Sequence, residues 1–354
     1  MTIPTEPIGS IPRPQELIEA VRAHEAGSLA EGELDAAYER AVRETIEAFH
    51  ATGSPVITDG EQSKPSFATY PIHGLAALAA DGVVIPFEDG HTRQLPRLTA
   101  GPFRYATFAD TYLAQAHRYA RVPVKQAVIA PSALSLLYPE GGIDGYPRDT
   151  FLDDLVDQAE ADVRRSLAGG AHVVQIDFTE GRLAVKLDPS HALLDGFIAL
   201  IRRVLMRFPA EDRRRIGIHT CPGADQDAAH SLDVDYAELL PSLLGLEVGN
   251  VYVQLASESD RRRVLGLIRE HMRPDQRIFV GVVDPIDPRV ETADEVRDRV
   301  LEAAEIIPID RLGTCDDCGF APFGDDTSTP RETAFAKIRA RVEGTDLAAD
   351  ELGA

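Results

Sequence analysis

The chain has 354 residues and a formal net charge of −22, from 36 Lys and Arg residues against 58 Asp and Glu residues. Its 44% hydrophobic content excludes a disordered chain, and its negative charge argues against a protein that binds nucleic acid or an anionic membrane surface. We find no apolar run of about 18 residues that could span a bilayer, no secretory signal and only three cysteines, so we expect a cytoplasmic protein with reduced thiols.

Eight short apolar runs predict strands that are buried on both faces, as in a parallel sheet. In chain order they are 6–10, 55–59, 124–130, 172–177, 216–220, 251–255, 278–283 and 309–314. Helical patterns cover 33–52, 150–168 and 292–306, the last after the N-cap-like pair Glu291 and Thr292. Strands that alternate with helices in this way favour a (β/α)₈ TIM barrel over an open doubly wound sheet.

The second and third predicted strands are separated by residues 60–123, which is far more than a crossover needs. Within this insertion, 82–108 is expected to form an extended hairpin that turns at 88–90. The hairpin either covers the mouth of the barrel as a lid or lies on the surface away from the site. We expect residues 1–342 to form one catalytic barrel and 343–354 to be a frayed acidic tail.

Polar residues follow each of the predicted strands. The active site of a (β/α)₈ barrel lies at the carboxyl ends of its strands, so these residues are expected to converge on one face. They are Ser10, 59–61, Ser132, Asp177, 219–221, 254–258, Asp284 and 315–318.

Two of these strand ends contain all three cysteines. His219 and Cys221 follow one strand, and Cys315 and Cys318 follow another. Thiolates and imidazole are ligands that Zn²⁺ prefers, although a redox pair and three buried structural thiols remain alternatives. Because a barrel of this size does not need a metal to fold, we expect a catalytic zinc. Such an ion lowers the pKa of a bound thiol and supplies a thiolate nucleophile, which favours alkyl transfer to sulfur over hydrolysis.

The chain resembles the catalytic barrel of the cobalamin-independent methionine synthase family, whose fold is similar to that of uroporphyrinogen decarboxylase. The motifs that carry the resemblance are Ile8-Gly9-Ser10 with Pro12-Arg13-Pro14, Thr58-Asp59-Gly60-Glu61, Gln175-Ile176-Asp177, His219-Thr220-Cys221 and Asp317-Cys318-Gly319-Phe320. The resemblance implies that His219, Cys221 and Cys318 are zinc ligands. It also implies that Glu61 and Asp177 hold the ammonium group of an amino-acid thiol, and that Ser10 binds its carboxylate.

Two departures from the family pattern concern the site. The remaining zinc ligand of the family is a Glu after the sixth strand, where this chain has Gln254; Cys315 or Glu258 could take its place. The chain also has no Trp to stack on a folate, a role for which Tyr70, Tyr138 and Phe320 are candidates.

The resemblance therefore predicts a zinc-dependent thiol alkyltransferase of methionine biosynthesis. The expected reaction is methyl transfer to a thiolate such as homocysteine, as in the 5-methyltetrahydropteroyltriglutamate–homocysteine methyltransferases. The segments 175–183 and 219–223 also resemble the epoxyalkane–coenzyme M transferases, in which a zinc thiolate opens an epoxide. In that alternative, Arg182 or Lys186 could bind an anionic thiol.

Two further alternatives are a corrinoid-dependent methyltransferase and a non-catalytic barrel that binds zinc or a thiol. Any transfer needs an acid to protonate the leaving atom, for which we predict His230, with Asp225 or Asp227 as alternatives. The expected partners are a small thiol and an alkyl donor, with no nucleic acid or membrane, and the sequence does not predict the oligomeric state.

Overall fold

Six parallel strands form the sheet of the computed structural model, which describes residues 2–354. Their order is β12-β11-β10-β7-β6-β5. The strands are β5 (Gln126–Ile129), β6 (Val174–Asp177), β7 (Ile216–Thr220), β10 (Asn250–Val253), β11 (Arg277–Val283) and β12 (Leu312–Asp316), all almost wholly buried. They match six predicted strands, but β12 begins later than expected because Ile309–Arg311 forms the 3₁₀ turn η2.

The first two predicted strands, 6–10 and 55–59, are not regular strands. Thr5 makes a single parallel bridge to Thr314 of β12, and Ile57 makes one to Val124 beside β5. Prolines interrupt the first segment and begin the second, and a proline has no N–H to donate to a ladder. The two segments still join each other, since the Ile11 N–H donates to the Gly60 carbonyl over 3.0 Å. The barrel is therefore closed, and the predicted (β/α)₈ fold is confirmed.

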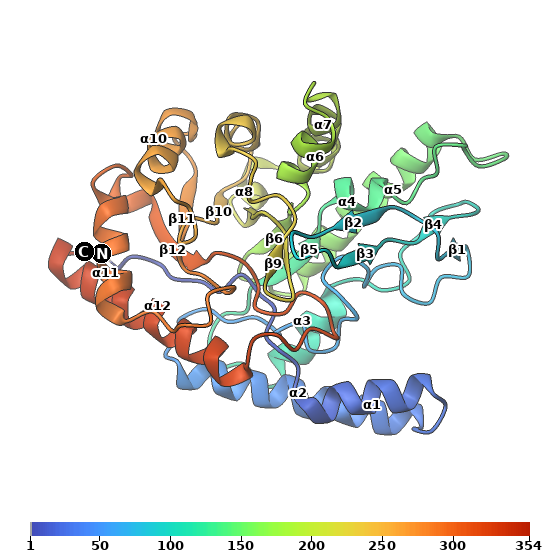
Figure 1. Cartoon of the computed structure of the whole chain (residues 1–354), viewed down its shortest axis with the longest axis horizontal. Coiled ribbons are helices and arrows are strands. Elements are labelled where there is room, and N and C mark those ends of the chain that lie inside the picture. Colours follow the sequence, from blue (N-terminus) through green and yellow to red (C-terminus); the bar gives the residue numbers. More distant parts are fainter. Residues whose placement is uncertain (1) are drawn as a thin grey trace.

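Helices form the outer layer of the barrel (Figure 1). The predicted helices 33–52, 150–168 and 292–306 are confirmed as α2, α5 and α11, each to within two residues. Thr292 caps α11 in a reciprocal box with Glu295. The helices are α1 (Gln15–Glu25), α2 (Glu31–Ala51), α3 (Asp110–His117), α4 (Pro131–Ser135), α5 (Arg148–Ala168), α6 (Gly181–Leu187), α7 (Ala192–Leu205), α8 (Ala210–Arg213), α9 (Leu240–Leu244), α10 (Arg261–His271), α11 (Ala293–Ala304) and α12 (Arg331–Leu352), with the 3₁₀ turn η1 (Tyr236–Glu238).

Among the residues described, no helix is both long and apolar enough to cross a membrane.

The expected frayed tail is instead the end of α12. Gly344 packs so closely on α11 that a Cβ there would lie 2.4 Å from a side-chain carbon of Val296. The Thr345 hydroxyl lies 2.8 Å from that of Thr314 in β12, and Ala348 is fully buried. Small residues in this segment let the helix approach the barrel closely. The prediction of a frayed tail, which rested on the acidic composition, is therefore wrong.

The insertion forms a ribbon of two short strand pairs. β1 (Leu78–Ala79) pairs with β4 (Arg97–Leu98), and β2 (Val84–Pro86) pairs with β3 (Thr92–Gln94). The tip of the ribbon meets the small hairpin of β8 (Ala224–Asp225) and β9 (Ala228–Ala229), where the Glu88 N–H donates to the Ala229 carbonyl over 3.0 Å. Figure 1 shows β2 and β3 beside β9. Because this hairpin follows Cys221, the ribbon lies over the carboxyl ends of the barrel strands.

Candidate active site

The structure brings together His219, Cys221 and Cys318. One possible ligand atom from each lies within 4.8 Å of the others, and all three side chains are buried. β7 ends between His219 and Cys221, whereas Cys318 follows β12. The Cys221 and Cys318 sulfurs are 3.1 Å apart, and neither is in a disulfide. The contact with Cys221, together with burial, raises the pKa of the Cys318 thiol well above its usual value, so a pair of thiolates here requires a cation.

The His219 ring is oriented by its neighbour in the sheet. Asp177 of β6 pairs in register with His219, and its Oδ1 lies 3.3 Å from His219 Nδ1. The same oxygen accepts a hydrogen bond of 2.7 Å from Gln175 Nε2. Metal-binding histidines commonly donate their second ring N–H to a carboxylate in this way, so Nε2, which lies 3.3 Å from the Asp317 carbonyl oxygen, is the nitrogen available to a metal.

Gln254, Cys315 and Glu258 are the three candidates for a further ligand. Gln254 follows β10, its N–H donates to the Thr220 carbonyl over 3.2 Å, and its Nε2 donates to the Ser257 hydroxyl over 2.5 Å. Its Oε1 is buried without a hydrogen-bond partner in the described chain. Cys315 lies elsewhere, in a cluster with Ile8, Tyr252 and Phe279. Cys315 therefore lies outside the cluster, which corrects the alternative in which it completes the site, and Gln254 stays the predicted further ligand.

Asp317 fixes the loop that follows Gln254. Its carboxylate accepts hydrogen bonds of 2.8 Å from the N–H groups of Leu255, Ala256 and Ser257. Gly281 makes room for it, since a Cβ there would lie 1.8 Å from Asp317 Oδ1. The sequence places Asp317 at a strand end but does not predict its contacts with this loop, because they join segments at least 60 residues apart.

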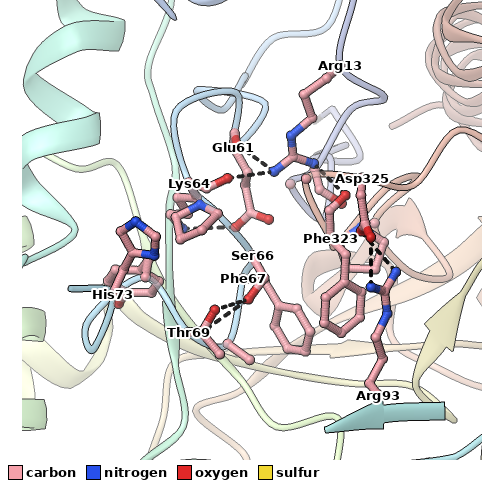
Figure 2. A pocket seen from close by; sticks show the side chains of 18 of the residues that line it. Arg13, Glu61, Lys64, Ser66, Phe67, Thr69, His73, Arg93, Phe323 and Asp325 are labelled. Carbon is pink, nitrogen blue, oxygen red and sulfur yellow. Dashed lines mark hydrogen bonds and ion pairs between the residues drawn. The ribbon is translucent and has the colours of Figure 1, made fainter. Parts of the chain in front are cut away.

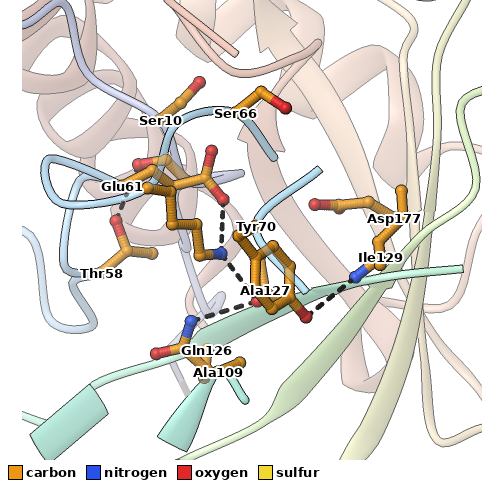
Figure 3. Close-up of polar contacts among 12 residues, drawn as sticks. Ser10, Thr58, Glu61, Ser66, Tyr70, Ala109, Gln126, Ala127, Ile129 and Asp177 are labelled. Atoms are coloured by element: carbon orange, nitrogen blue, oxygen red, sulfur yellow. Dashed lines mark hydrogen bonds and ion pairs between the residues drawn. The ribbon is translucent and has the colours of Figure 1, made fainter. Parts of the chain in front are cut away.

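A cavity of about 1020 Å³ opens beside this cluster, and His219 and Cys318 lie in its wall. Ser10, Glu61 and Asp177, the three predicted substrate-binding residues at strand ends, also line it. The Ser10 hydroxyl accepts the Ala321 N–H over 3.2 Å. Both recorded contacts of the Asp177 carboxylate use Oδ1, and Figure 3 shows its side chain directed towards the region of Ser10 and Glu61. The cavity therefore joins the metal-ligand cluster to a set of polar groups.

Glu61 is held in place by a lysine that sequence analysis did not single out. Lys64 Nζ donates to Glu61 Oε1 over 2.9 Å and to the Ala127 carbonyl over 3.0 Å, with both side chains buried. Although burial lowers the pKa of Lys64, Glu61 and Asp59 raise it above its usual value, so the lysine stays charged. Figure 2 shows Arg13 reaching the same turn, where it binds the carbonyl of Glu61 over 2.7 Å. Glu61 has the left-handed backbone φ of 56°, and these contacts hold that strained conformation.

The sequence of this chain matches a known family over nearly its whole length. The family model described as "Cobalamin-independent synthase, Catalytic domain" matches residues 3–344. The chain belongs to this family.

Similar proteins agree with this membership. The chain is 23% identical over 353 residues to a methionine synthase of Sulfurisphaera tokodaii, with 99% of this chain and 94% of the relative covered. It is 25% identical over 324 residues to a 5-methyltetrahydropteroyltriglutamate–homocysteine methyltransferase of Nitratidesulfovibrio vulgaris, covering 90% of this chain but 39% of that longer protein. A solved B12-independent methionine synthase from a Shewanella species, in complex with selenomethionine, superimposes with a TM-score of 0.79 at 20% identity, covering 99% of both chains.

His230 lines the cavity of this family member but is a poor proton donor. Its Nδ1 lies 2.8 Å from the Ser231 hydroxyl, and burial, with the charge of Lys186, lowers the pKa of His230 to about 4. The ring is therefore unprotonated at neutral pH, which corrects the expectation that it supplies a proton. The alternative Asp225 is paired with Arg93, and Asp227 is exposed.

Arg182 does not line the cavity. Its guanidinium stacks on the Tyr236 ring at 3.5 Å from the centroid and bonds Glu258 over 2.5 Å. Leu183, the next residue, does face the cavity, because successive helical residues point about 100° apart. The structure gives no support to Arg182 as a substrate ligand, and Glu258 is committed to this pair rather than to a metal.

Glu180 is a cavity residue that sequence analysis missed. It precedes α6, is 5% exposed and lines the cavity. The Ser132 hydroxyl donates to its Oε1, and its Oε2 is buried without a partner among residues 2–354. Burial raises the pKa of Glu180 to about 7, although the Ser132 hydrogen bond acts in the opposite direction. Its position three residues after Asp177 was the available signal.

An arginine fastens the ribbon over the cavity. Arg93 of β3 donates to both oxygens of Asp225 in β8 and to both oxygens of Asp325 after β12. Figure 2 shows the Arg93–Asp325 pair beside Phe323, whose ring centroid is 4.2 Å from the guanidinium. Ile85 and Phe87 of the ribbon line the cavity. The ribbon thus forms part of the cavity wall, as the lid hypothesis requires.

Arg93→Ala is expected to loosen this ribbon. Loss of charge-assisted hydrogen bonds to the buried Asp225 should accelerate amide hydrogen exchange across 84–94 by at least about tenfold. Arg97→Ala is the matched control, because the Arg97–Asp81 pair of the same ribbon is solvent-exposed. Equal exchange in the two variants would show that Arg93 does not fasten the ribbon.

Proposed function

We propose that this chain is a zinc-dependent methyltransferase that transfers a methyl group to the sulfur of a small thiol, as methionine synthases do. The acceptor is homocysteine and the donor a 5-methyltetrahydropteroyl polyglutamate. The observation that carries the proposal is the buried His219, Cys221 and Cys318 cluster in the wall of the large cavity. Membership of the cobalamin-independent synthase family and the names of the relatives support it.

The donor set suits zinc. Two sulfurs and one imidazole are soft ligands in the combination that Zn²⁺ favours, and the unpaired Gln254 Oε1 can add a weaker neutral oxygen ligand. When bound, the ion lowers the pKa of the acceptor thiol and so supplies a thiolate at neutral pH. Because the site depends on two reduced thiols, it requires a reducing compartment such as the cytoplasm.

The chain's own residues position the acceptor. Asp177 Oδ2 and the free oxygen of Glu61 accept the hydrogens of the acceptor's ammonium group, and the Ser10 hydroxyl donates to its carboxylate. Burial raises the pKa of Glu61, but Lys64 opposes this shift by pairing with Oε1 and favours the ionised form, which accepts hydrogen bonds. No observation on this chain favours opening of an epoxide, and Arg182, which would have served an anionic thiol, is paired with Glu258.

The test is thiol binding at the metal, followed by transfer. Purified protein should contain about one zinc per chain, and the cobalt-substituted protein should change its sulfur-ligand absorption when homocysteine is added. Coenzyme M should produce a weaker change. Removal of the metal with a chelator should abolish methyl transfer, and restored zinc should recover it. The proposed function would be refuted if the protein cannot be loaded with metal. It would also be refuted if no thiol changes the absorption of the cobalt-substituted protein.

A further inference from the structure

The proposed methyl transfer needs a proton donor in the cavity. When a thiolate takes a methyl group from a tertiary amine, the electron pair of the broken C–N bond remains on nitrogen. An amide ion is too unstable to leave, so nitrogen must receive a proton as the bond breaks. The following inference rests on the proposed function and assigns this proton.

The other acids and imidazoles of the inner cavity are unsuited to this task. His230 is unprotonated at neutral pH. Glu61 accepts a hydrogen bond from the charged Lys64, and Asp177 accepts one from Gln175 while it faces His219. The further carboxylates and imidazoles in the cavity wall are exposed, except for the half-buried His24: they are His24, Glu25, Glu31, Asp35, His73 and Asp325.

Glu180 differs from these groups in its surroundings. Its Oε1 is anchored by Ser132 of α4, so the direction of the carboxyl group is fixed. Its Oε2 is buried and has no partner in the described structure, although the residue lines the cavity. A buried carboxyl oxygen without a partner is costly for an ionised group and less so for a protonated one. The groups that face Glu180 are the Ser132 hydroxyl and Ala133 N–H of α4 and the Asp177 carboxylate of β6.

We propose that Glu180 is the general acid that protonates the leaving nitrogen of the methyl donor from Oε2. The S–C bond forms between the acceptor sulfur and the methyl carbon while the C–N bond breaks. The nitrogen electron pair takes the Glu180 proton, which yields a thioether and a secondary amine. The acceptor thiol has released one proton to solvent, and Glu180 regains one from solvent, so atoms and charge balance.

Glu180→Gln tests this role with two donors. The glutamine keeps the oxygen that accepts from Ser132 but cannot supply the proton. Transfer from methyltetrahydropteroyl triglutamate should fall by about 100-fold or more. Transfer from methyl iodide, corrected for the rate without protein, should change by less than about threefold, because iodide leaves without a proton. Glu140→Gln is the matched control, since Glu140 is exposed, and it should leave both rates unchanged.

Two measurements separate this proposal from the proposed function. With the pterin donor, the wild-type rate should decline as the pH rises through about 7, where Glu180 loses its proton, and Glu180→Gln should lack this limb. Infrared difference spectra of wild type minus Glu180→Gln should show a protonated carboxyl at pH 6 that disappears at pH 8, without any turnover.

Each outcome is decisive. An unchanged rate with the pterin donor, or an equal loss with both donors, overturns the role of Glu180 while wild-type transfer keeps the proposed function intact. If the zinc-loaded wild type transfers a methyl group from neither donor, the proposed function itself is overturned, and the assignment of Glu180 with it.

Discussion

Replacing Cys318 with serine is expected to release the metal and to abolish methyl transfer. Cys318 supplies one of the two sulfurs of the cluster and lies 3.1 Å from the other. A serine hydroxyl is a harder and much weaker ligand for zinc than a thiolate. Changing a group that merely orients a ligand costs about 10–100-fold in metal affinity or activity, so loss of a ligand itself should exceed that range. Zinc per chain, measured on the purified variant, is the first readout.

Cys315→Ser is the matched control for this experiment. Both thiols are buried and lie only three positions apart, yet Cys315 packs against Tyr252 and Phe279 inside the barrel. Burial, with the neighbouring Asp316 carboxylate, raises the pKa of the Cys315 thiol well above the usual value, so Cys315 is a neutral thiol. The control variant should therefore retain its zinc and its methyl transfer. If Cys315→Ser loses metal as completely as Cys318→Ser, then the assignment of the site to His219, Cys221 and Cys318 is wrong.

These two cysteines show how far the sequence predicts the site. The placement of His219 and Cys221 followed from a short apolar strand and the barrel rule, because both residues are local to one strand end. Two cysteines at metal-ligand spacing looked equivalent in sequence. Which of them joins the cluster depends on where β12 ends. Because the strand continues to Asp316, Cys315 lies within it, whereas Cys318 lies in the loop that follows.

The residues that the sequence did not predict act through contacts between distant segments. Lys64 pairs with Glu61 three positions away, but its position also depends on a hydrogen bond to the Ala127 carbonyl of β5. Asp317 holds a loop 60 residues away in the chain. Glu180 acquires its character from burial beside Ser132, which belongs to another βα unit. A sequence pattern reports periodicity and strand ends, whereas the pKa of a carboxyl group depends on desolvation and neighbours that only the folded chain provides. The same reason explains why His230 was a poor choice.

The second large effect is on stability and concerns an ion pair of α12. Lys337 of α12 and Glu291, which lies before α11, form an ion pair of 2.9 Å whose side chains are 0% and 1% exposed. The other oxygen of Glu291 accepts the Asp284 N–H over 2.8 Å at the end of β11. The pair thus ties the last helix to a strand end on the active-site face of the barrel.

Lys337→Met is expected to lower the free energy of unfolding by up to about 3–5 kcal/mol, because it removes the nearest cation of the buried Glu291 carboxylate. The cation that remains is Arg299, whose Nη1 lies 3.7 Å from Glu291 Oε1. Urea unfolding at pH 7 should show the loss as a lower midpoint. Arg262→Met serves as control, since the Arg262–Glu305 pair is 59% and 60% exposed and exposed pairs contribute little, so its midpoint should match that of the wild type. Equal midpoints for Lys337→Met and the wild type would mean that water or a rearranged side chain compensates Glu291. The Lys337–Glu291 pair would then not be the contact that secures α12 at this end of the barrel.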